Sequence, residues 1–186
     1  PSIVEGFVNE NREYIQKIFS NEKYLRVYTS SDVIGVETGG AIKNAIAIVS
    51  GIASGMGLGE NARAGLISRG IKEIASIVVA LGGKKETAYG LSGVGDLIVT
   101  ASSMNSRNFQ CGLRIGRGES IEQAEGSIVQ SVEGIRAIKA GHEIGIKYNL
   151  ELPIIDTAYL VVTNKLSAED GLHQLLARDL KEEKYC

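Results

Sequence analysis

The sequence has little proline, cysteine or histidine and almost no net charge. Pro1 and Pro153 are its only prolines, so long helices can run between them and the 23 glycines become the main breaks. Cys111 and Cys186 lack metal-ligand spacing, which excludes a zinc motif and favours reduced thiols in a cytoplasmic protein. A formal net charge of -2 argues against broad binding of nucleic acid, so any anionic partner should be small.

The first residues, PSIVEGFV, lack an initiator methionine, a basic region and an apolar signal core. We therefore expect a piece of a larger protein. With 44% hydrophobic and 23% charged residues, the chain has the composition of a globular protein that buries its core in one domain, with or without an appendage.

The pattern changes from strand-helix-strand to helical near residue 31. An apolar run at 3–8, a helical pattern at 10–19 and an alternating stretch at 25–29 make a unit too small to bury its own faces. The remainder predicts a mainly α, multi-helix domain with a turn-rich piece at 91–108. The expected helices cover 33–53, 60–81, 108–115, a short stretch capped by Ser120, a helix capped by Ser131 and ending near Tyr148, 153–164, and a last one capped by Ser167 with Leu172 to Leu180 on its apolar face.

The stretch Val33 to Ala53 contains only two charged residues, Glu37 and Lys43. We interpret it as a buried helix that carries a working lysine. Small and apolar neighbours partly desolvate the ammonium, which favours its neutral form and suits a general base. Gly39 and Gly40, one turn earlier, would let a backbone or a ligand approach it.

Two other interpretations of Lys43 stay open at this point. The lysine can extend to solvent from the edge of its helix and have no chemical role. A membrane-spanning helix is disfavoured, because Lys43 and Asn44 would then lie near the middle of the bilayer, where a lysine costs roughly 3 kcal/mol.

A second chemical stretch runs from Ser92 to Asn108. It contains Asp96, Thr100 and then Ser106, Arg107 and Asn108 at the start of a helix. Hydroxyl, guanidinium and amide groups beside free helix N–H groups make a site for phosphate or carboxylate. The alternatives are an ordinary helix cap with an exposed arginine, and an Asp96 that serves only as a turn residue.

Other motifs favour structural roles. The glycines of GMGLGENARAG (55–65) follow a helix, so the strand-turn-helix context of a dinucleotide loop is missing, and GVG (93–95) is shorter still. We expect turn and packing glycines at both places. His142 and His173 stand alone among charged neighbours, which favours surface positions.

The motifs GVETGGAIKN, SGVGDLIVT, NSRN and SVEG, in this order and at these intervals, resemble the C-terminal domain of NAD(P)-dependent glycerol-3-phosphate dehydrogenases, especially the bacterial type. The resemblance covers nearly the whole chain. It implies a helical fold of the 6-phosphogluconate dehydrogenase C-terminal-like type at 31–186, and a remnant of the NAD(P)-binding Rossmann domain at 1–30.

The resemblance also implies roles for single residues. Lys43 matches the family's proton acceptor for the C2 hydroxyl of the substrate. The matching substrate residues are Lys43, Asn44, Asp96, Thr100, Ser106, Arg107 and Asn108, the last three around the phosphate. The matching cofactor contacts are Arg107, Ser131 and Glu133, although Ser131 stands where many relatives carry an apolar residue.

The implied enzyme interconverts sn-glycerol 3-phosphate and dihydroxyacetone phosphate and feeds glycerophospholipid synthesis. NAD or NADP would be bound mainly by an N-terminal domain absent from this chain, so the chain alone should be inactive. We expect a cytoplasmic homodimer with a small phosphorylated substrate and no nucleic acid, metal or transmembrane segment. Two alternatives stay open: the helical domain of a related hydroxyacid or 6-phosphogluconate-type dehydrogenase, and a non-catalytic helical module whose Lys43 is exposed and does not converge with Asp96 and Arg107.

Overall fold

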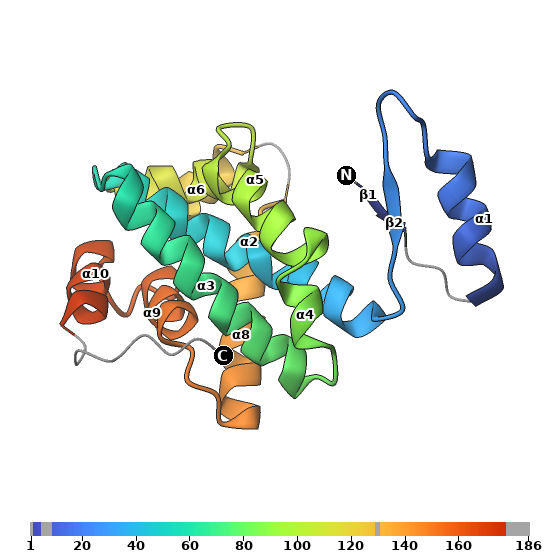
Figure 1. Ribbon diagram of the computed structural model, residues 1–186. Coiled ribbons are helices and arrows are strands. Elements are labelled where there is room, and N and C mark those ends of the chain that lie inside the picture. The colour runs from blue at the N-terminus through green and yellow to red at the C-terminus, as the bar shows by residue number, and fades with distance from the viewer. Residues whose placement is uncertain (1, 5–8, 129–130, 178–186) are drawn as a thin grey trace.

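The chain folds into a helical body with a small strand-helix-strand unit at its N-terminal end (Figure 1). The computed structural model describes residues 2–4, 9–128 and 131–177. The elements in these residues are β1 (Ser2–Val4), α1 (Asn9–Phe19), β2 (Val27–Thr29), α2 (Val33–Gly55), α3 (Glu60–Ala80), α4 (Lys85–Ala88), the π-helical turn η1 (Leu91–Gly95), α5 (Asp96–Ser102), α6 (Arg107–Gly116), α7 (Ile121–Gly126), α8 (Glu133–Tyr148), α9 (Pro153–Val162) and α10 (Ala168–Leu176). The predicted mainly α fold class is confirmed.

The first unit has the expected order, with α1 connecting two strands that run in the same direction. β1 and β2 pair in parallel, with Ser2 opposite Val27. Two parallel strands need a crossover connection between them, and α1 is that connection. Figure 1 shows this unit standing to one side of the helical body.

Helix α2 lies at the centre of the helical body and contacts α3, α5, α6 and α8. Ala45, Ile46, Ala47 and Ile48 are fully buried, which explains the long run of small and apolar residues in the sequence. Among the described residues, α2 alone is long and apolar enough to cross a membrane, and half of that stretch is buried inside the protein.

The contact between α2 and α6 is a direct backbone approach. Gly51 and Gly55 of α2 face Gly112 and Gly116 of α6, and the two pairs share the same four-residue spacing. A Cβ atom added at any of these positions would overlap backbone atoms of the opposite helix. Gly40, by contrast, has open space beside it, and a Cβ at Gly39 would make only ordinary contacts. The closest glycine approach therefore lies further along α2 than the lysine.

Two buried carboxylates hold helix starts in place. Asp32, the N-cap of α2, accepts hydrogen bonds from the backbone N–H of Gly35 (3.0 Å) and from that of Lys84 (2.8 Å), so it also fixes the loop after α3. Glu73 of α3 accepts from the backbone N–H groups of Ile154 (2.7 Å) and Ile155 (3.0 Å) at the start of α9. A side chain distant in sequence thus satisfies the free donors of α9.

Two of the local predictions are wrong. The stretch predicted to be turn-rich is helical from 91 to 102, because Leu97 and Ala101 are fully buried and hold the segment against the core as α5. Ser131 does not cap α8: Val132 is the N-cap and makes no side-chain cap bond. Leu180 and Cys186, together with part of the predicted first strand, lie outside the described residues.

Candidate active site

Lys43 forms an ion pair with the carboxylate of Asp96. The lysine lies on the core helix α2, and only 14% of its side chain is exposed, whereas 45% of the Asp96 side chain is exposed. A mostly buried lysine beside a half-exposed aspartate suits a cation that binds a small molecule entering from solvent. The family resemblance implied that these two residues lie together, and the structure joins them in an ion pair.

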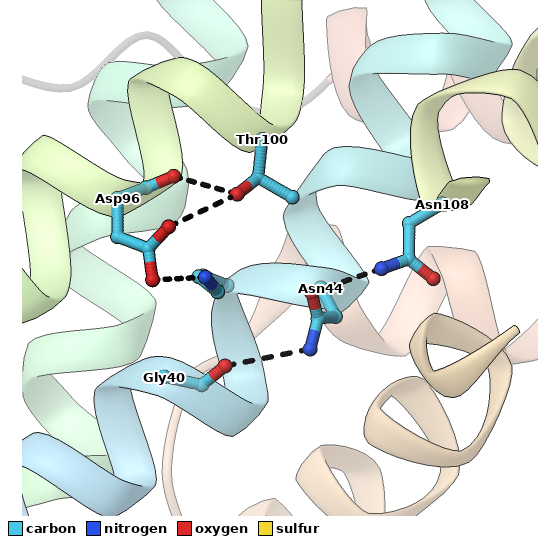
Figure 2. A network of polar contacts seen from close by, with 6 residues as sticks. Gly40, Asn44, Asp96, Thr100 and Asn108 are labelled. Atoms are coloured by element: carbon cyan, nitrogen blue, oxygen red, sulfur yellow. Dashed lines mark hydrogen bonds and ion pairs between the residues drawn. The ribbon is translucent and has the colours of Figure 1, made fainter. Parts of the chain in front are cut away.

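Asp96 is held in position by the turn before it and by the helix that it starts. The π-helical turn η1 leads directly into Asp96, and a Cβ at Gly93 would overlap the backbone carbonyl of Ala88. Such π-helical turns are rare and occur often at functional sites. The Thr100 hydroxyl lies 2.7 Å from the backbone oxygen of Asp96 and 3.3 Å from its Oδ1, so its one proton is shared between them (Figure 2).

Asn44, the residue after Lys43, belongs to a second polar network, which reaches α8. Its Oδ1 accepts a hydrogen bond of 2.9 Å from Nδ2 of Asn108, and Oδ1 of Asn108 accepts one of 2.9 Å from the backbone N–H of Gly134. Nδ2 of Asn44 donates to the carbonyl of Gly40 over 3.4 Å (Figure 2). Both asparagines are buried, with 8% and 9% exposed.

Ser106 and Arg107 lie where α6 begins. The Ser106 hydroxyl is the N-cap and accepts from the backbone N–H of Phe109 at 3.3 Å, while Arg107 is exposed in the first turn. The helix cap with an exposed arginine, which was the alternative interpretation, is present, and the anion site at the same place stays a prediction. Asn108, the third predicted member, lies inside the network of Asn44 instead of on the surface.

The two predicted cofactor contacts at the start of α8 are both exposed. Glu133 is the first residue of the helix, and Ser131 precedes the N-cap. Glu133 precedes Gly134 in the chain, and the backbone N–H of Gly134 donates a hydrogen bond to Asn108. The position of Glu133 is therefore linked to the hydrogen-bond network of Asn44 and Asn108.

Other reactive side chains lie elsewhere and have structural surroundings. Burial raises the pKa of Cys111 to about 11, which keeps this thiol protonated and unreactive near neutral pH. His142 is not the isolated surface residue predicted from the sequence: its Nδ1 lies 2.7 Å from Oδ1 of Asp156, and its ring stacks on Tyr159. Among the described residues, no group of three or more His, Cys, Asp or Glu side chains could hold a metal ion.

Two hollows in the helical body lie away from Lys43. One is lined mainly by apolar side chains of α2, α3, α9 and α10, and the other by residues at the end of α6, the start of α7 and the segment from α9 to α10. They share Met56, Val161, Ala168 and Leu172, and neither is lined by any of the predicted site residues. The polar contacts of the predicted site residues lie instead on α2, α5, α6 and the start of α8.

Sequence reasoning missed Gly134, because its role depends on a backbone N–H that meets a side chain 26 residues earlier. A hint existed: SVEG has no good capping residue at Val132, so the first N–H groups of α8 needed a partner from elsewhere. Nothing in the sequence identified Asn108 as that partner.

Comparison with known proteins gives one consistent result. Residues 32–173 match the family model described as NAD-dependent glycerol-3-phosphate dehydrogenase C-terminus. The chain is 59% identical over 172 residues to the NAD(P)+ glycerol-3-phosphate dehydrogenase of Acholeplasma laidlawii, covering 92% of this chain and 52% of that protein. It is 46% identical over 181 residues to that of Carboxydothermus hydrogenoformans, covering 97% and 54%.

A solved structure agrees with these sequences. The crystal structure of glycerol-3-phosphate dehydrogenase from Coxiella burnetii superimposes with a TM-score of 0.90 at 34% identity, over 96% of this chain and 55% of that one. The chain thus spans about half the length of the curated relatives it matches.

Proposed function

Since the chain belongs to the NAD-dependent glycerol-3-phosphate dehydrogenase family, whose C-terminal domain it contains, we propose that it is the substrate domain of an oxidoreductase. This enzyme interconverts sn-glycerol 3-phosphate and dihydroxyacetone phosphate with NAD or NADP. Residues 31–186 form the helical substrate domain, and residues 1–30 are the end of the cofactor domain. The observation that carries the proposal is the partly buried Lys43 paired with Asp96 beside Asn44.

Lys43 is the proposed acid and base. As an ammonium it donates a proton to the C2 oxygen when the ketone is reduced, and as a neutral amine it takes the C2 hydroxyl proton when the alcohol is oxidised. The Asp96 carboxylate orients the ammonium and offsets its charge, and Thr100 holds Asp96. A non-catalytic module would leave Lys43 exposed, whereas 86% of its side chain is covered.

The remaining site residues bind the substrate in this proposal. Arg107, exposed in the first turn of α6, and Ser106 at its cap supply donors for the phosphate. Asn44 supplies an amide beside Lys43, and Asn108 completes the set that the family assigns. A small phosphorylated substrate suits this group, because guanidinium, hydroxyl and helix N–H groups all donate hydrogen bonds.

The described residues provide only a part of a cofactor site. The glycines at 55–65 lie at the end of α2, in the turn that follows it and in the first part of α3, so a helix and not a strand precedes them and they do not form the strand-turn-helix loop that binds a dinucleotide. Arg107 and Glu133, with Ser131 nearby, are exposed at the starts of α6 and α8, where they can contact a cofactor held by another domain. When bound, the nicotinamide supplies or accepts the hydride at C2.

Family membership supports further proposals about the whole protein. We propose a cytoplasmic homodimer whose glycerol 3-phosphate feeds glycerophospholipid synthesis, with no role for nucleic acid.

The test uses the full-length enzyme that carries this chain. NAD(P)H-linked reduction of dihydroxyacetone phosphate is measured for wild type, Lys43→Ala and Arg107→Ala. Lys43→Ala should lower kcat by about 10²- to 10⁴-fold, the usual contribution of a general acid or base. Arg107→Ala should raise KM by about 10- to 100-fold, because a charged hydrogen bond to phosphate is lost.

Arg117→Ala is the matched control, since Arg117 is an exposed arginine at the opposite end of α6. It should leave both constants unchanged. If wild type turns over and the Lys43→Ala variant has the same kcat, Lys43 is not the acid and base of the reaction. If the wild-type enzyme does not reduce dihydroxyacetone phosphate but reduces the ketone form of another hydroxyacid, the proposed substrate is wrong and the related hydroxyacid dehydrogenase is the better assignment.

A further inference from the structure

Ser50 is a polar residue in a buried, apolar part of α2. The residues before it, from Ala45 to Val49, are all apolar and buried, and Ser50 itself is fully buried. A buried hydroxyl is costly unless it forms a hydrogen bond. Ser50 donates one of 2.8 Å to the backbone carbonyl of Ala101, near the C-terminal end of α5. This bond joins the core helix to the short helix that begins at Asp96.

The bond of Ser50 differs from those of other hydroxyl groups on the helices. The hydroxyl groups of Ser76, Thr100 and Ser102 each donate to the carbonyl four residues earlier in their own helix. Such bonds are local and satisfy no helix end. Ser50 instead crosses to α5, whose last carbonyls have no partner inside the helix. It therefore satisfies a helix end that is distant in sequence.

Helix α2 thus holds α5 at both ends. Lys43 pairs with Asp96, the first residue of α5, and Ser50 binds the carbonyl of Ala101 in its last turn. Lys43 and Ser50 are two helical turns apart on one face of α2, about 10 Å along its axis. The buried Leu97 also packs α5 against the core, but apolar contacts have no fixed direction, whereas a hydrogen bond does.

The outer face of α5 is largely exposed, with Ile98 at 51% and Val99 at 65%, so the position of α5 depends mainly on its inner contacts. We propose that Ser50 is a positioning residue: by holding the far end of α5, it fixes the place of the Asp96 carboxylate beside Lys43. The kinetic consequence of this inference rests on the proposed function, whereas the position of Asp96 can be tested without activity.

The kinetic test is a double-mutant cycle in the full-length enzyme, measured as NAD(P)H-linked reduction of dihydroxyacetone phosphate. Ser50→Ala removes the donor to Ala101. We expect kcat to fall about tenfold and KM to change less than about threefold, because Asp96 is misplaced while the start of α6 is unchanged. In an Asp96→Asn background the carboxylate is already absent, so Ser50→Ala should cause little further loss of kcat.

Two variants are the controls. Ser76→Ala removes a hydroxyl that bonds within α3, and Val162→Ala weakens the buried core at α9. Both should keep the kcat of wild type, which separates a change at α5 from a general loss of stability. Thermal unfolding verifies that each variant is folded.

Equal losses of kcat on Ser50→Ala with and without the Asp96 carboxylate would mean that Ser50 does not act through Asp96, and they would overturn the proposal. A wild-type kcat for Ser50→Ala would also overturn it. If Ser50→Ala does not fold, Ser50→Cys gives the decision, because its thiol occupies a similar space but is a weaker donor. Its kcat must then fall, and a wild-type value overturns the proposal.

The position of Asp96 is measured separately by nuclear magnetic resonance on the 186-residue chain. Ser50→Ala should move the ¹³C signal of the Asp96 carboxylate and accelerate hydrogen exchange of the α5 amides, because the helix is held less firmly. A change confined to the carbonyl signal of Ala101 would mean that the bond is only local, and it would overturn the inference. If Asp96 responds as expected but the wild-type enzyme ignores dihydroxyacetone phosphate, the proposed function fails and the positioning role stands.

Discussion

The carboxylate of Asp32 connects the start of α2 to the loop after α3, and its protonation should lower the free energy of unfolding. Burial raises the pKa of Asp32, but hydrogen bonds from the Thr87 side chain and from the backbone N–H groups of Lys84 and Gly35 together outweigh that effect. The pKa in the folded protein is therefore below the ordinary value of 3.8. The charged form is the one that the fold prefers.

This shift gives the sign of a pH dependence. The stabilisation by Asp32 is complete above 3.8, and it is lost as the pH falls through the lower pKa of the folded state. Asp32→Asn replaces one acceptor by an NH₂ group that faces a backbone N–H, at a cost of about 1–3 kcal/mol near neutral pH. Urea unfolding of both chains should show this difference at about pH 6 and a smaller difference at about pH 3, because only wild type loses the charge.

Carboxylates common to both chains titrate equally, so the difference between them isolates Asp32. A difference that stays constant between the two pH values would mean that the Asp32 charge contributes nothing to the stability.

The resemblance to the family placed Lys43 and Asp96 together, but the network beside them was not predicted. The residue patterns alone marked Lys43 as a lysine inside a run of apolar residues, and they left the turn interpretation of Asp96 open. The Asn108 contacts depend on which face of α6 turns inward and on where α8 starts. Those are consequences of packing three helices, which local patterns do not encode. His142 shows the same limit, because its partner Asp156 comes from the next helix.

At the scale of elements, the stability of the body depends on how closely α2 and α6 approach. A Cβ at Gly112 would overlap the carbonyl oxygen of Ile48 and come within 2.9 Å of the nitrogen of Ile52. Both contacts are with backbone, so the helices themselves must separate. Gly112→Ala should lower the free energy of unfolding by about 2–3 kcal/mol.

Gly65→Ala is the matched control, because Gly65 also lies within a helix, α3, but a Cβ there would meet nothing within 4 Å. It should stabilise the chain by roughly 0.5–1 kcal/mol, since alanine favours the helix. Denaturant unfolding of the two variants measures both effects. Equal shifts of the same sign would contradict a backbone contact at Gly112.

Helix positions were predictable where one local signal was strong: the helical spacing of apolar residues gave α3, and the Ser120 capping box gave α7. The prediction failed where tertiary contacts replaced local signals. α5 is only seven residues long, and it exists because Leu97 and Ala101 bury against α2. The start of α8 is satisfied by Asn108 and not by a capping residue.

At the scale of the whole molecule, the strand-helix-strand unit has few links to the helical body. β1, α1 and β2 contact mainly one another, and Figure 1 shows them standing apart. Two parallel strands are marginal on their own, and parallel sheets normally have both faces covered. Large apolar side chains of the unit are exposed, among them Tyr14 (66%), Ile18 (58%) and Phe19 (58%). This surface is consistent with our proposal that residues 1–30 belong to a larger cofactor domain.

Removing residues 1–30 should therefore leave the helical domain intact. The shortened chain keeps Asp32, α2 and every element that packs against α2. Its thermal midpoint should therefore stay within about 4 °C of that of the 186-residue chain, which corresponds to a change of less than about 1 kcal/mol in the free energy of unfolding. Its exposed apolar area decreases, so sedimentation that depends on concentration in the longer chain should become independent of concentration.

The double variant Ile18→Lys with Phe19→Lys provides the control for self-association without deletion, because both side chains are more than half exposed on α1. It should abolish self-association and leave the thermal midpoint unchanged. A large fall in the midpoint on deletion would mean that the first 30 residues belong to the helical domain. Association that persists in both variants would arise from other exposed apolar residues, such as Ile98 and Val99 of α5, next to the ion pair of Lys43 and Asp96.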